Sequence, residues 1–499
     1  MRYFSRFHFF LMKGAEAIHP SILIFSLCFF LLVPCLGYSA IAISNITDLQ
    51  KIGNDVEYPL NGEYELTQDI DASETVNWKL GDGFQPIGTK ANPFIGKFDG
   101  KGHKITNLFI DKPSSDYVGL FGYVGSYIGS GGIIQDVRIE ELWLAGNNYV
   151  GGLVGYLDWG ALINNCGVYG YVSGNSEVGG LLGRSDNGII NNCSFNGSVY
   201  GFEKVGGLIG KTYFGKVNNC CANAFVSGHF NIGGLLGINS KGKINTSCAT
   251  GELSGTSGLG GLIGANAGEV KNSYSMASIS MGPMYVGGLI GYNEQSVENC
   301  YSIGFISGGY PFVGGLIGWN GGSVTNSYWN IESSGRTTSD GGEGKTTSEM
   351  KQQATFMDWD FTTIWGLNEG ISYPYLLWQG GPTPEPEGMI EGMHEGNAEG
   401  EGETLPPHSA DQNGDWQINL IELLRVIQLY NSGGYHCDSL GEDGYAPGPG
   451  EVNCSPHSSD CNPQDWKINL PELLRIIQIY NMGIYHACPN RSEDNYCPG

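Results

Sequence analysis

The sequence predicts a mainly β protein whose central part is a parallel β-helix, or β-solenoid, of about seven 27-residue coils with end caps. An acidic linker and a small α-helical C-terminal module are expected to follow. Three observations predict this fold: a glycine-rich segment that recurs every 27 residues, 80 glycines in a chain of 499 residues, and a change of composition after Trp378. A chain of this length is too long for one compact core, so an elongated repeat array is favoured.

The N-terminal segment has the features of an export signal. Basic residues precede an apolar run at residues 22–36, and Ala40 and Ala42 follow it. This order of basic, apolar and small residues is typical of a signal peptide. Residues 1–42 are therefore predicted to be a signal peptide, with a retained membrane anchor as the alternative, because the apolar run is at the short limit for a membrane span.

The recurring segment defines the coils of the predicted solenoid. VGGLVGY begins at Val150, and six variants follow at spacings of 28 and then 27 residues. They begin at Val178, Val205, Ile232, Leu259, Val286 and Val313, and a degenerate copy begins at Val118. Short apolar segments with this fixed period are typical of strands stacked in coils. Glycine is expected at the corners, where φ is positive and neighbouring backbones run close.

Each repeat continues to a second signature, in which Asn or Thr precedes Cys or Ser. The amide column is Asn165, Asn192, Asn219, Thr246, Asn272, Asn299 and Asn326. These side chains are expected to form a hydrogen-bonded ladder along the solenoid. The Cys or Ser is interpreted as a small group in a crowded turn, and zinc is not expected because no CxxC spacing occurs. Disulfide pairing among Cys166, Cys193 and Cys220 stays open, because a one-coil separation does not forbid it.

At these residues the chain resembles proteins that carry the GLUG motif, named for the Gly-Leu-apolar-Gly of each repeat. Residues 43–117, with FIGKFDGKGHKI from Phe94, are similar to the N-terminal capping module of such proteins. Residues 118–329 hold the repeats, and residues 330–378 are similar to the C-terminal cap. The resemblance implies a parallel β-helix in a secreted or cell-surface protein. GLUG repeats are found in adhesin-like proteins and beside a bacterial immunoglobulin-cleaving peptidase.

Charge and the placement of acidic residues argue against several functions. The net charge of −25 disfavours nucleic acid and anionic membranes as partners. Cleavage of a polysaccharide needs paired carboxylates on one face, but the acidic residues of the repeats share no column. Asp69, Asp71, Asp99 and His103 form the strongest remaining cluster and are interpreted as turn and cap residues. No catalytic residue is therefore assigned, and the chain is predicted not to be an enzyme.

The composition of the chain changes after the C-terminal cap. Residues 379–408 are rich in Gly, Pro and Glu and contain no Lys or Arg, so they are predicted to be an extended linker. Residues 409–499 contain two related segments 50 residues apart, which begin DWQINL at Asp415 and DWKINL at Asp465. Apolar residues at helical spacing follow each start, so a helix is expected in each copy.

Both copies contain a candidate calcium loop of the EF-hand type. Such a loop supplies oxygen ligands from alternate positions and a final carboxylate. The first loop offers Asp411, Asn413, Asp415, Gln417, Asn419 and Glu422. The second offers Asp460, Asn462, Asp465, Lys467, Asn469 and Glu472, with one extra residue in its first half, so calcium binding there stays open. The alternative for both is a polar turn that caps a helix.

The paired loop and helix resemble type I dockerin repeats. This resemblance implies calcium as a cofactor and a cohesin-like or other surface protein as the partner of the tail. The tail departs from dockerins in the Glu that ends its first loop and in five cysteines, Cys437, Cys454, Cys461, Cys488 and Cys497. These cysteines are expected to form disulfides that stabilise a module with little hydrophobic core of its own.

The sequence as a whole predicts an exported surface or extracellular scaffold, or an adhesin-like binding protein, docked through its calcium-dependent tail. The solenoid is expected to present a surface for a glycan or for a host or cell-surface ligand. The alternative is a carbohydrate-active β-helix enzyme, a polysaccharide lyase or hydrolase, carried by a dockerin.

Overall fold

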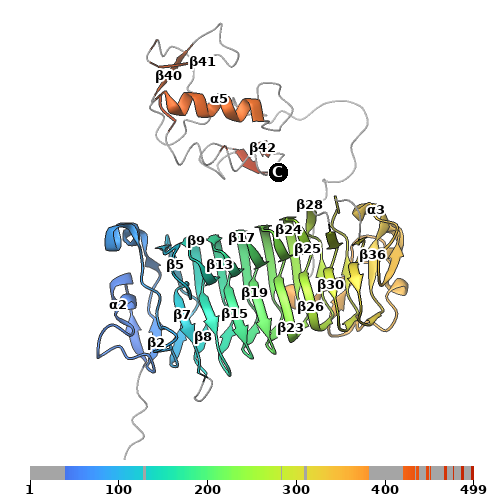
Figure 1. The fold of residues 1–499 in the computed structure, drawn as a ribbon, viewed down its shortest axis with the longest axis horizontal. Coiled ribbons are helices and arrows are strands. Elements are labelled where there is room, and N and C mark those ends of the chain that lie inside the picture. Colours follow the sequence, from blue (N-terminus) through green and yellow to red (C-terminus); the bar gives the residue numbers. More distant parts are fainter. Residues whose placement is uncertain are drawn as a thin grey trace, which may run out of the picture. The chain divides into compact units, whose positions relative to one another are not determined.

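The computed structural model describes residues 40–126, 131–281, 284–307, 312–380, 420–432, 434–437, 445–448, 450, 466–468, 476, 485–487 and 496–498. The chain divides into two compact units, residues 1–387 and 388–499. The first unit is a parallel β-solenoid of about 10 turns, which stack along its long axis (Figure 1). In the described part of the chain, no helix is long and apolar enough to cross a membrane. The predicted signal peptide up to residue 39 and the linker from residue 381 lie outside the described residues.

Three parallel sheets form the sides of the solenoid and contain 17, 13 and 7 strands within the described residues. The first sheet comprises β1 (Ile41–Ile43), β2 (Glu63–Leu66), β4 (Lys97–Asp99), β7 (Phe121–Val124), β8 (Ile133–Gln135), β11 (Val154–Leu157), β12 (Leu162–Asn164), β15 (Leu182–Asp186), β16 (Ile189–Asn191), β19 (Ile209–Tyr213), β20 (Lys216–Asn218), β23 (Leu236–Asn245), β26 (Ile263–Lys271), β30 (Ile290–Asn293), β31 (Val297–Glu298), β34 (Ile317–Asn320) and β35 (Val324–Thr325). The second comprises β3 (Ile70–Asp71), β5 (Lys104–Thr106), β6 (Phe109–Asp111), β9 (Arg138–Ala145), β13 (Gly167–Ser173), β17 (Ser194–Tyr200), β21 (Cys221–Ser227), β24 (Cys248–Ser254), β27 (Tyr274–Ser275), β28 (Ser278–Met281), β32 (Tyr301–Ser302), β36 (Tyr328–Asn330) and β37 (Glu343–Lys345). The third comprises β10 (Asn148–Gly151), β14 (Ser176–Gly179), β18 (Glu203–Gly206), β22 (Phe230–Gly233), β25 (Ser257–Gly260), β29 (Met284–Gly287) and β33 (Val313–Gly314).

Short helices and hairpins complete the described elements. In the first unit these are α2 (Ile46–Lys51), η1 (Ser73–Gly81), α3 (Ile331–Ser334), α4 (Thr347–Met350), η2 (Gln353–Thr355), η3 (Leu377–Gln379) and the pair β38 (Trp365–Gly366) and β39 (Tyr375–Leu376). In the second unit they are α5 (Leu420–Asn431), β40 (Tyr435–Cys437), β41 (Tyr445–Pro447), β42 (Tyr485–Ala487) and β43 (Tyr496–Pro498).

The coils stack in register, so that residues one repeat apart lie directly over one another. Val205 in β18 pairs with Ile232 in β22, and Val217 in β20 pairs with Ile244 in β23. Inward-facing side chains of the three sheets, mostly Val, Leu and Ile, form one continuous hydrophobic core along the solenoid. A fixed 27-residue period therefore places like residues in columns.

The predicted number of about seven coils is too small. Strands in residues 43–117 pair in the same sheets as the regular repeats, since β2 pairs with β4 and β4 pairs with β8. Asp99 in β4 lies opposite Gln135 in β8, 36 residues further on, rather than 27. Longer connections between these coils hide the period in the sequence, so the structure has about 10 turns.

The GLUG glycines lie where neighbouring backbones approach. A Cβ atom at Gly206 would lie 2.0 Å from the carbonyl oxygen of Ile209, and one at Gly207 would lie 2.0 Å from that of Gly234 in the next coil. No side chain fits at such distances. The expected positive φ at these glycines is wrong: it occurs instead at recurring non-glycine residues, such as Lys204 with φ 57°.

The predicted amide ladder is confirmed in part. It links Thr246, Asn219 and Asn192, and separately Asn299 and Asn272, whereas Asn192 and Asn272 donate onward to Asn164 and Asn245, outside the predicted column. Thr246 Oγ1 donates to Asn219 Oδ1 at 2.6 Å, and Asn219 Nδ2 donates to Asn192 Oδ1 at 3.1 Å. All seven column members have a positive φ of 46–55°. Asparagine tolerates this left-handed conformation better than most residues, which explains its recurrence at this turn.

A second amide ladder was not predicted and lies inside the solenoid. Asn239, Asn266, Asn293 and Asn320 stack in consecutive coils of the first sheet. The Nδ2 atoms of Asn239, Asn266 and Asn293 each donate to the Oδ1 of the next residue in the ladder at 2.7 Å. Asn266 is only 1% exposed. These amides therefore satisfy one another in the core.

The Cys and Ser column occupies a crowded turn, as expected. Each thiol or hydroxyl donates to the carbonyl oxygen two residues earlier, as Cys220 Sγ does to Asn218 at 3.2 Å and Ser247 Oγ to Asn245 at 2.8 Å. Cys166, Cys193, Cys220 and Cys300 are buried and free. Burial raises the pKa of Cys300 to about 12, which keeps this thiol protonated and unreactive.

A disulfide joins the adjacent outward-facing column. Cys221 in β21 bonds to Cys248 in β24, directly opposite it in the next coil, with a Cα–Cα distance of 4.6 Å. Gln379 Nε2 lies 3.4 Å and 3.3 Å from the two sulfur atoms. The end of the first unit therefore folds back to the middle of the second sheet.

The segment that ends at Gln379, here called the returning segment, packs on aromatic residues of the second sheet. Beyond Cys248 the same column continues with Tyr274, Tyr301 and Tyr328. These tyrosines are buried under a separate cluster that includes Trp359 and Trp365. The returning segment thus shields the outer face of the last coils from water.

In the second unit, α5 forms a small core with the hairpin β40–β41. Leu423, Val426 and Leu429 are buried on one face of α5, against Tyr435 and Tyr445. The helix agrees with the apolar spacing predicted for the first copy. Cys437 is disulfide-bonded.

The buried ladder leads to a test of its contribution to stability. Replacing Asn266→Ala removes two ladder hydrogen bonds and leaves buried amide groups of Asn239 and Asn293 with poorer partners. We expect this change to lower the free energy of unfolding by about 2 kcal/mol, measured by urea unfolding followed by circular dichroism. Asn223→Ala, at an exposed position of β21, is the control and should change it by less than about 0.5 kcal/mol. Equal effects of the two substitutions would contradict this account.

Candidate binding surface on the solenoid

The predicted calcium ligands lie almost entirely outside the described residues. Only two exceptions occur: Glu422 belongs to α5, and Lys467 is described and exposed. In the part of the chain that the structure describes, no group of three or more His, Cys, Asp or Glu residues is arranged to hold a metal ion. The calcium loops therefore remain predictions.

The most distinctive polar surface of the solenoid lies where the third sheet turns into the first. Two neighbouring columns run along this corner, and we call them together the corner surface. One column comprises Tyr123, Tyr156, Arg184, Lys211, Ile238, Ala265, Tyr292 and Trp319. The other comprises Tyr117, Tyr149, Glu177, Lys204, Asn231, Gly258, Tyr285 and Phe312, all with positive φ. The corner surface is therefore aromatic at both ends, with charged residues and then uncharged, non-aromatic residues between them.

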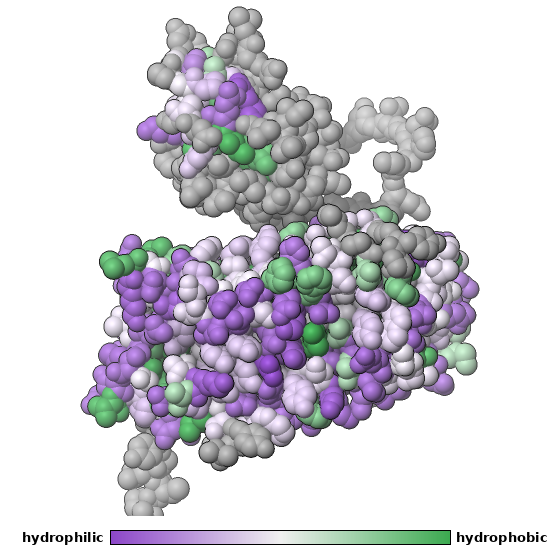
Figure 2. Space-filling view, viewed as in Figure 1, coloured by the Kyte–Doolittle hydropathy of each residue, from purple (hydrophilic) through white to green (hydrophobic). Residues whose placement is uncertain are grey.

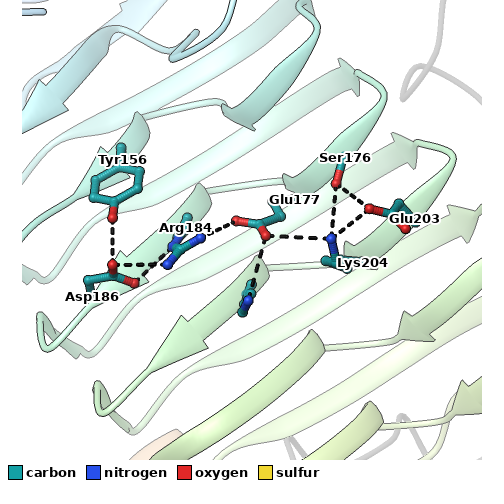
Figure 3. Close-up of polar contacts among 8 residues, drawn as sticks. Tyr156, Ser176, Glu177, Arg184, Asp186, Glu203 and Lys204 are labelled. Carbon is teal, nitrogen blue, oxygen red and sulfur yellow. Dashed lines mark hydrogen bonds and ion pairs between the residues drawn. The ribbon is translucent and has the colours of Figure 1, made fainter. Parts of the chain in front are cut away.

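Figure 3 shows the charged part of the corner surface. Glu177 is 5% exposed and lies 3.3 Å from Arg184, 3.7 Å from Lys204 and 3.8 Å from Lys211. Glu177 and Arg184 belong to one coil, and Lys204 and Lys211 belong to the next. The carboxylate of Glu177 therefore offsets the repulsion between the stacked cations of two successive coils.

Two further carboxylates complete this network. Asp186 receives two hydrogen bonds from Arg184, at 2.8 Å and 3.0 Å, and one from Tyr156 at 2.5 Å. Glu203 is paired with Lys204 at 2.6 Å and accepts a hydrogen bond from Ser176 at 2.8 Å. The contacts with Lys204 and Ser176 lower the pKa of Glu203. Burial and the bond to Asp186 raise the pKa of Tyr156, which keeps its hydroxyl protonated.

The two aromatic ends of the corner surface consist of stacked rings. At the N-terminal end, Tyr123 stacks on Tyr156 with ring centroids 4.7 Å apart. At the C-terminal end, Tyr292 stacks on Trp319 at 4.3 Å, and Tyr285 on Phe312 at 5.1 Å. Flat, electron-rich rings of this kind are frequent in binding surfaces.

The acidic cluster of the opening coils has the structural role that was expected. Asp69 contacts His103 Nδ1 at 3.1 Å and accepts a hydrogen bond from the backbone N–H of Lys104 at 3.2 Å. Asp99 is mostly buried and contacts Lys97 at 3.4 Å. These contacts hold turns in place and bring no pair of carboxylates to a common cleft.

Analysis of the sequence missed the corner surface. Its signal was present, since one column immediately precedes the VGG of each repeat and the other immediately follows the GLUG segment. Reading these two positions down the aligned repeats gives aromatic, charged, small and again aromatic residues. The prediction from the sequence considered the acidic positions by themselves, so it did not include their pairing with cations of the same or the next coil.

The charged network can be tested by removing its central carboxylate. Glu177→Gln keeps the size of the side chain and removes the charge that three cations share, so we expect the free energy of unfolding to fall by about 2 kcal/mol. Glu269→Gln is the matched control, because Glu269 pairs with Lys243 at a half-exposed site. It should cost less than about 0.5 kcal/mol in the same urea titration. A smaller effect at Glu177 than at Glu269 would refute a structural role for the network.

Comparison with known proteins identifies the repeats. The family model described as the GLUG motif matches residues 174–200 and 282–307. Halomucin of Haloquadratum walsbyi is 38% identical over 149 residues, which are 29% of this chain and 2% of halomucin. A Gly-rich membrane protein of Evansella cellulosilytica is 35% identical over 155 residues, covering 24% of this chain and 17% of that protein. The immunoglobulin A1 protease of Streptococcus sanguinis is 26% identical over 145 residues, covering 29% and 7%.

Among solved structures, a Bacteroides ovatus protein described as an immunoglobulin A1 protease matches with a TM-score of 0.40 and 20% identity. The match covers 68% of this chain and 93% of that one. The sequence matches, by contrast, extend over only small parts of the relatives named above. Together with the observed coils, the family model supports one conclusion: the chain is a parallel β-solenoid whose coils carry GLUG repeats.

Proposed function

We propose that the chain is an exported, non-catalytic surface scaffold of the adhesin type, whose solenoid presents a binding face and whose tail docks it in the presence of calcium. The observation that carries this proposal is the corner surface. Its acidic groups pair with cations of the same or neighbouring coils, and its stacked aromatic rings stand at both ends. Such a surface suits recognition of a ligand better than its cleavage.

The pKa shifts of the described carboxyl groups point to structural roles for these groups. A general acid for glycan cleavage needs a carboxyl group whose pKa is raised. Among the described residues, every carboxyl group with a shifted pKa has it lowered by hydrogen bonds or ion pairs, as for Asp69 and Glu203. No specific observation favours the alternative of a polysaccharide lyase or hydrolase.

A location at the cell surface agrees with several features. The N-terminal segment has the order of residues that exports proteins. A disulfide in the solenoid suits an oxidising compartment. Of the relatives, one is named a membrane protein. The face of the solenoid shown in Figure 2 is mainly hydrophilic with scattered apolar patches, which is consistent with exposure of this face to water.

Calcium-dependent docking through the tail rests on the donor chemistry of the two loops. The first loop offers Asp411, Asp415 and Glu422 as carboxylate ligands, in the alternating pattern that surrounds a hard cation with oxygen. The second loop offers similar donors, with Lys467 in the place of Gln417 and one extra residue in its first half, so the proposal rests on the first loop. By resemblance to dockerins, the partner is a cohesin-like or other surface protein.

Calorimetry with the full chain tests the metal site. We expect calcium to bind, and Asp415→Ala together with Glu422→Gln to remove the binding at the first loop, because two of its charged ligands are lost. Asp158→Asn, in the solenoid, is the control and should leave calcium binding unchanged. Absence of calcium binding to the wild-type chain would refute the proposed tail.

Docking itself is tested by capture from the native cell envelope, with the full chain as bait in calcium and in chelator. We expect a surface protein to be retained only in calcium, and to be lost with the double variant of the first loop. Retention that is equal in chelator, or unchanged in the double variant, would overturn calcium-dependent docking.

A further inference from the structure

The last coil of the solenoid borders a cavity of about 620 Å³. One wall is formed by Phe312 and Trp319, and the other by the loop at residues 335–340. Hydrogen bonds hold this loop to the coil: Gly315 N–H donates to the Thr338 carbonyl at 2.9 Å, and Asn320 N–H donates to Asp340 Oδ2 at 2.7 Å. The two walls are therefore fixed relative to each other. The volume lies in the range of small-ligand sites.

The aromatic wall is the C-terminal end of the corner surface. Trp319 stacks on Tyr292 with an angle of 7° between the rings, and Phe312 stacks on Tyr285 with an angle of 14°. In earlier coils, the residue at the same position of the next coil lies against each ring. β33 and β34 are the last strands of their kind in the described residues, so no further coil supplies a ring. One face of each ring therefore stacks on the ring of the preceding coil, and both rings line the cavity.

The opposite wall supplies groups that both donate and accept hydrogen bonds. Thr337, Thr338 and Asp340 are exposed at the cavity, beside Ser339. Arg336 also lines it, with its guanidinium anchored on the carbonyl oxygen of Ile306 at 2.8 Å. The cavity therefore has an aromatic wall that faces a row of hydroxyl groups and one carboxylate.

We propose that this cavity binds a neutral saccharide, with one sugar ring against Trp319 and Phe312. A pyranose has faces of C–H groups and a rim of hydroxyl groups. Polarised C–H groups are attracted to the negative face of an aromatic ring. The rim hydroxyls match Thr337, Thr338 and the carboxylate of Asp340, since each hydroxyl donates and accepts.

The charges of the cavity lining favour an uncharged ligand. Arg336 and Asp340 both line the cavity, so one positive and one negative charge offset each other there and an uncharged ligand is favoured. The inference rests on the proposed role of the solenoid as a binding surface and names its ligand class. It does not depend on the tail.

The test is calorimetric titration of the full chain with five neutral hexasaccharides: cellohexaose, laminarihexaose, xylohexaose, mannohexaose and chitohexaose. We expect at least one to bind with a Kd below about 1 mM. Trp319→Ala should weaken that binding about tenfold or more, because it removes the stacking ring.

Phe312→Asn provides a second variant that keeps the fold. Phe312 is 44% exposed, and Asn231 occupies the same column with the same positive φ. We expect Phe312→Asn to weaken binding as well, with an unchanged circular dichroism spectrum. Trp143→Ala is the control, because Trp143 is a partly exposed tryptophan of the second sheet that also stacks on aromatic neighbours.

Three results would overturn the inference: no binding of any of the five saccharides to the wild-type chain at millimolar concentration, unchanged binding in both cavity variants, or an equal loss in Trp143→Ala. Calcium-dependent capture by the tail is measured separately. A chain that binds no saccharide and still docks in calcium would therefore refute the cavity assignment and leave the surface role standing.

Discussion

Parallel pairing of each coil with the next, in register, is the constraint on which the rest of the structure depends. Once Val205 lies opposite Ile232, every side chain in the regular coils has the corresponding residue of the next coil as its neighbour. The residues of one column must then pack favourably on one another. Apolar columns form the core, amides form ladders, and glycines remain where backbones come too close for a Cβ atom. Like charges are the exception, because they repel when stacked.

The corner surface shows how the protein accommodates charge under this constraint. Arg184, Lys204 and Lys211 lie near one another because their coils are adjacent, and the mostly buried Glu177 lies within 4 Å of all three. Aromatic residues in one column do not repel one another, because their rings stack favourably. A repeated fold therefore produces long, chemically uniform stripes. The pattern stops at the end of the solenoid, where the stacked rings border the loop at residues 335–340 and form a cavity.

Much of this organisation could be predicted from the sequence, because residues that recur with a fixed period occupy the same position in each coil. The strands, the outer amide ladder and the crowded Cys and Ser turn follow from residues that recur every 27 positions. The inner ladder was harder to recognise, because Asn239 and its partners continue a column occupied by Ser185 and Thr212 in earlier coils. The opening coils were missed because their spacing reaches 36 residues. The cavity depends on the path of the chain after the last repeat, for which no period exists.

The cysteines also show which features the sequence predicts and which only the structure shows. The thiols of Cys166, Cys193 and Cys220 attracted attention because they share a column, yet they point inward and hydrogen-bond to nearby carbonyl groups. The disulfide lies one residue further on, between Cys221 and Cys248, where side chains point outward. Alternation along a strand separates the two sets, although they are adjacent in the sequence.

Mapping this disulfide tests the in-register stacking most directly. The unreduced full chain would be denatured, its free thiols alkylated, and its peptides analysed by tandem mass spectrometry. In-register coils predict a link between Cys221 and Cys248, with Cys166, Cys193, Cys220 and Cys300 alkylated. A link from Cys221 to a cysteine that is not one coil away, or a link between two cysteines of the inward column, would contradict the register on which this account of the solenoid depends.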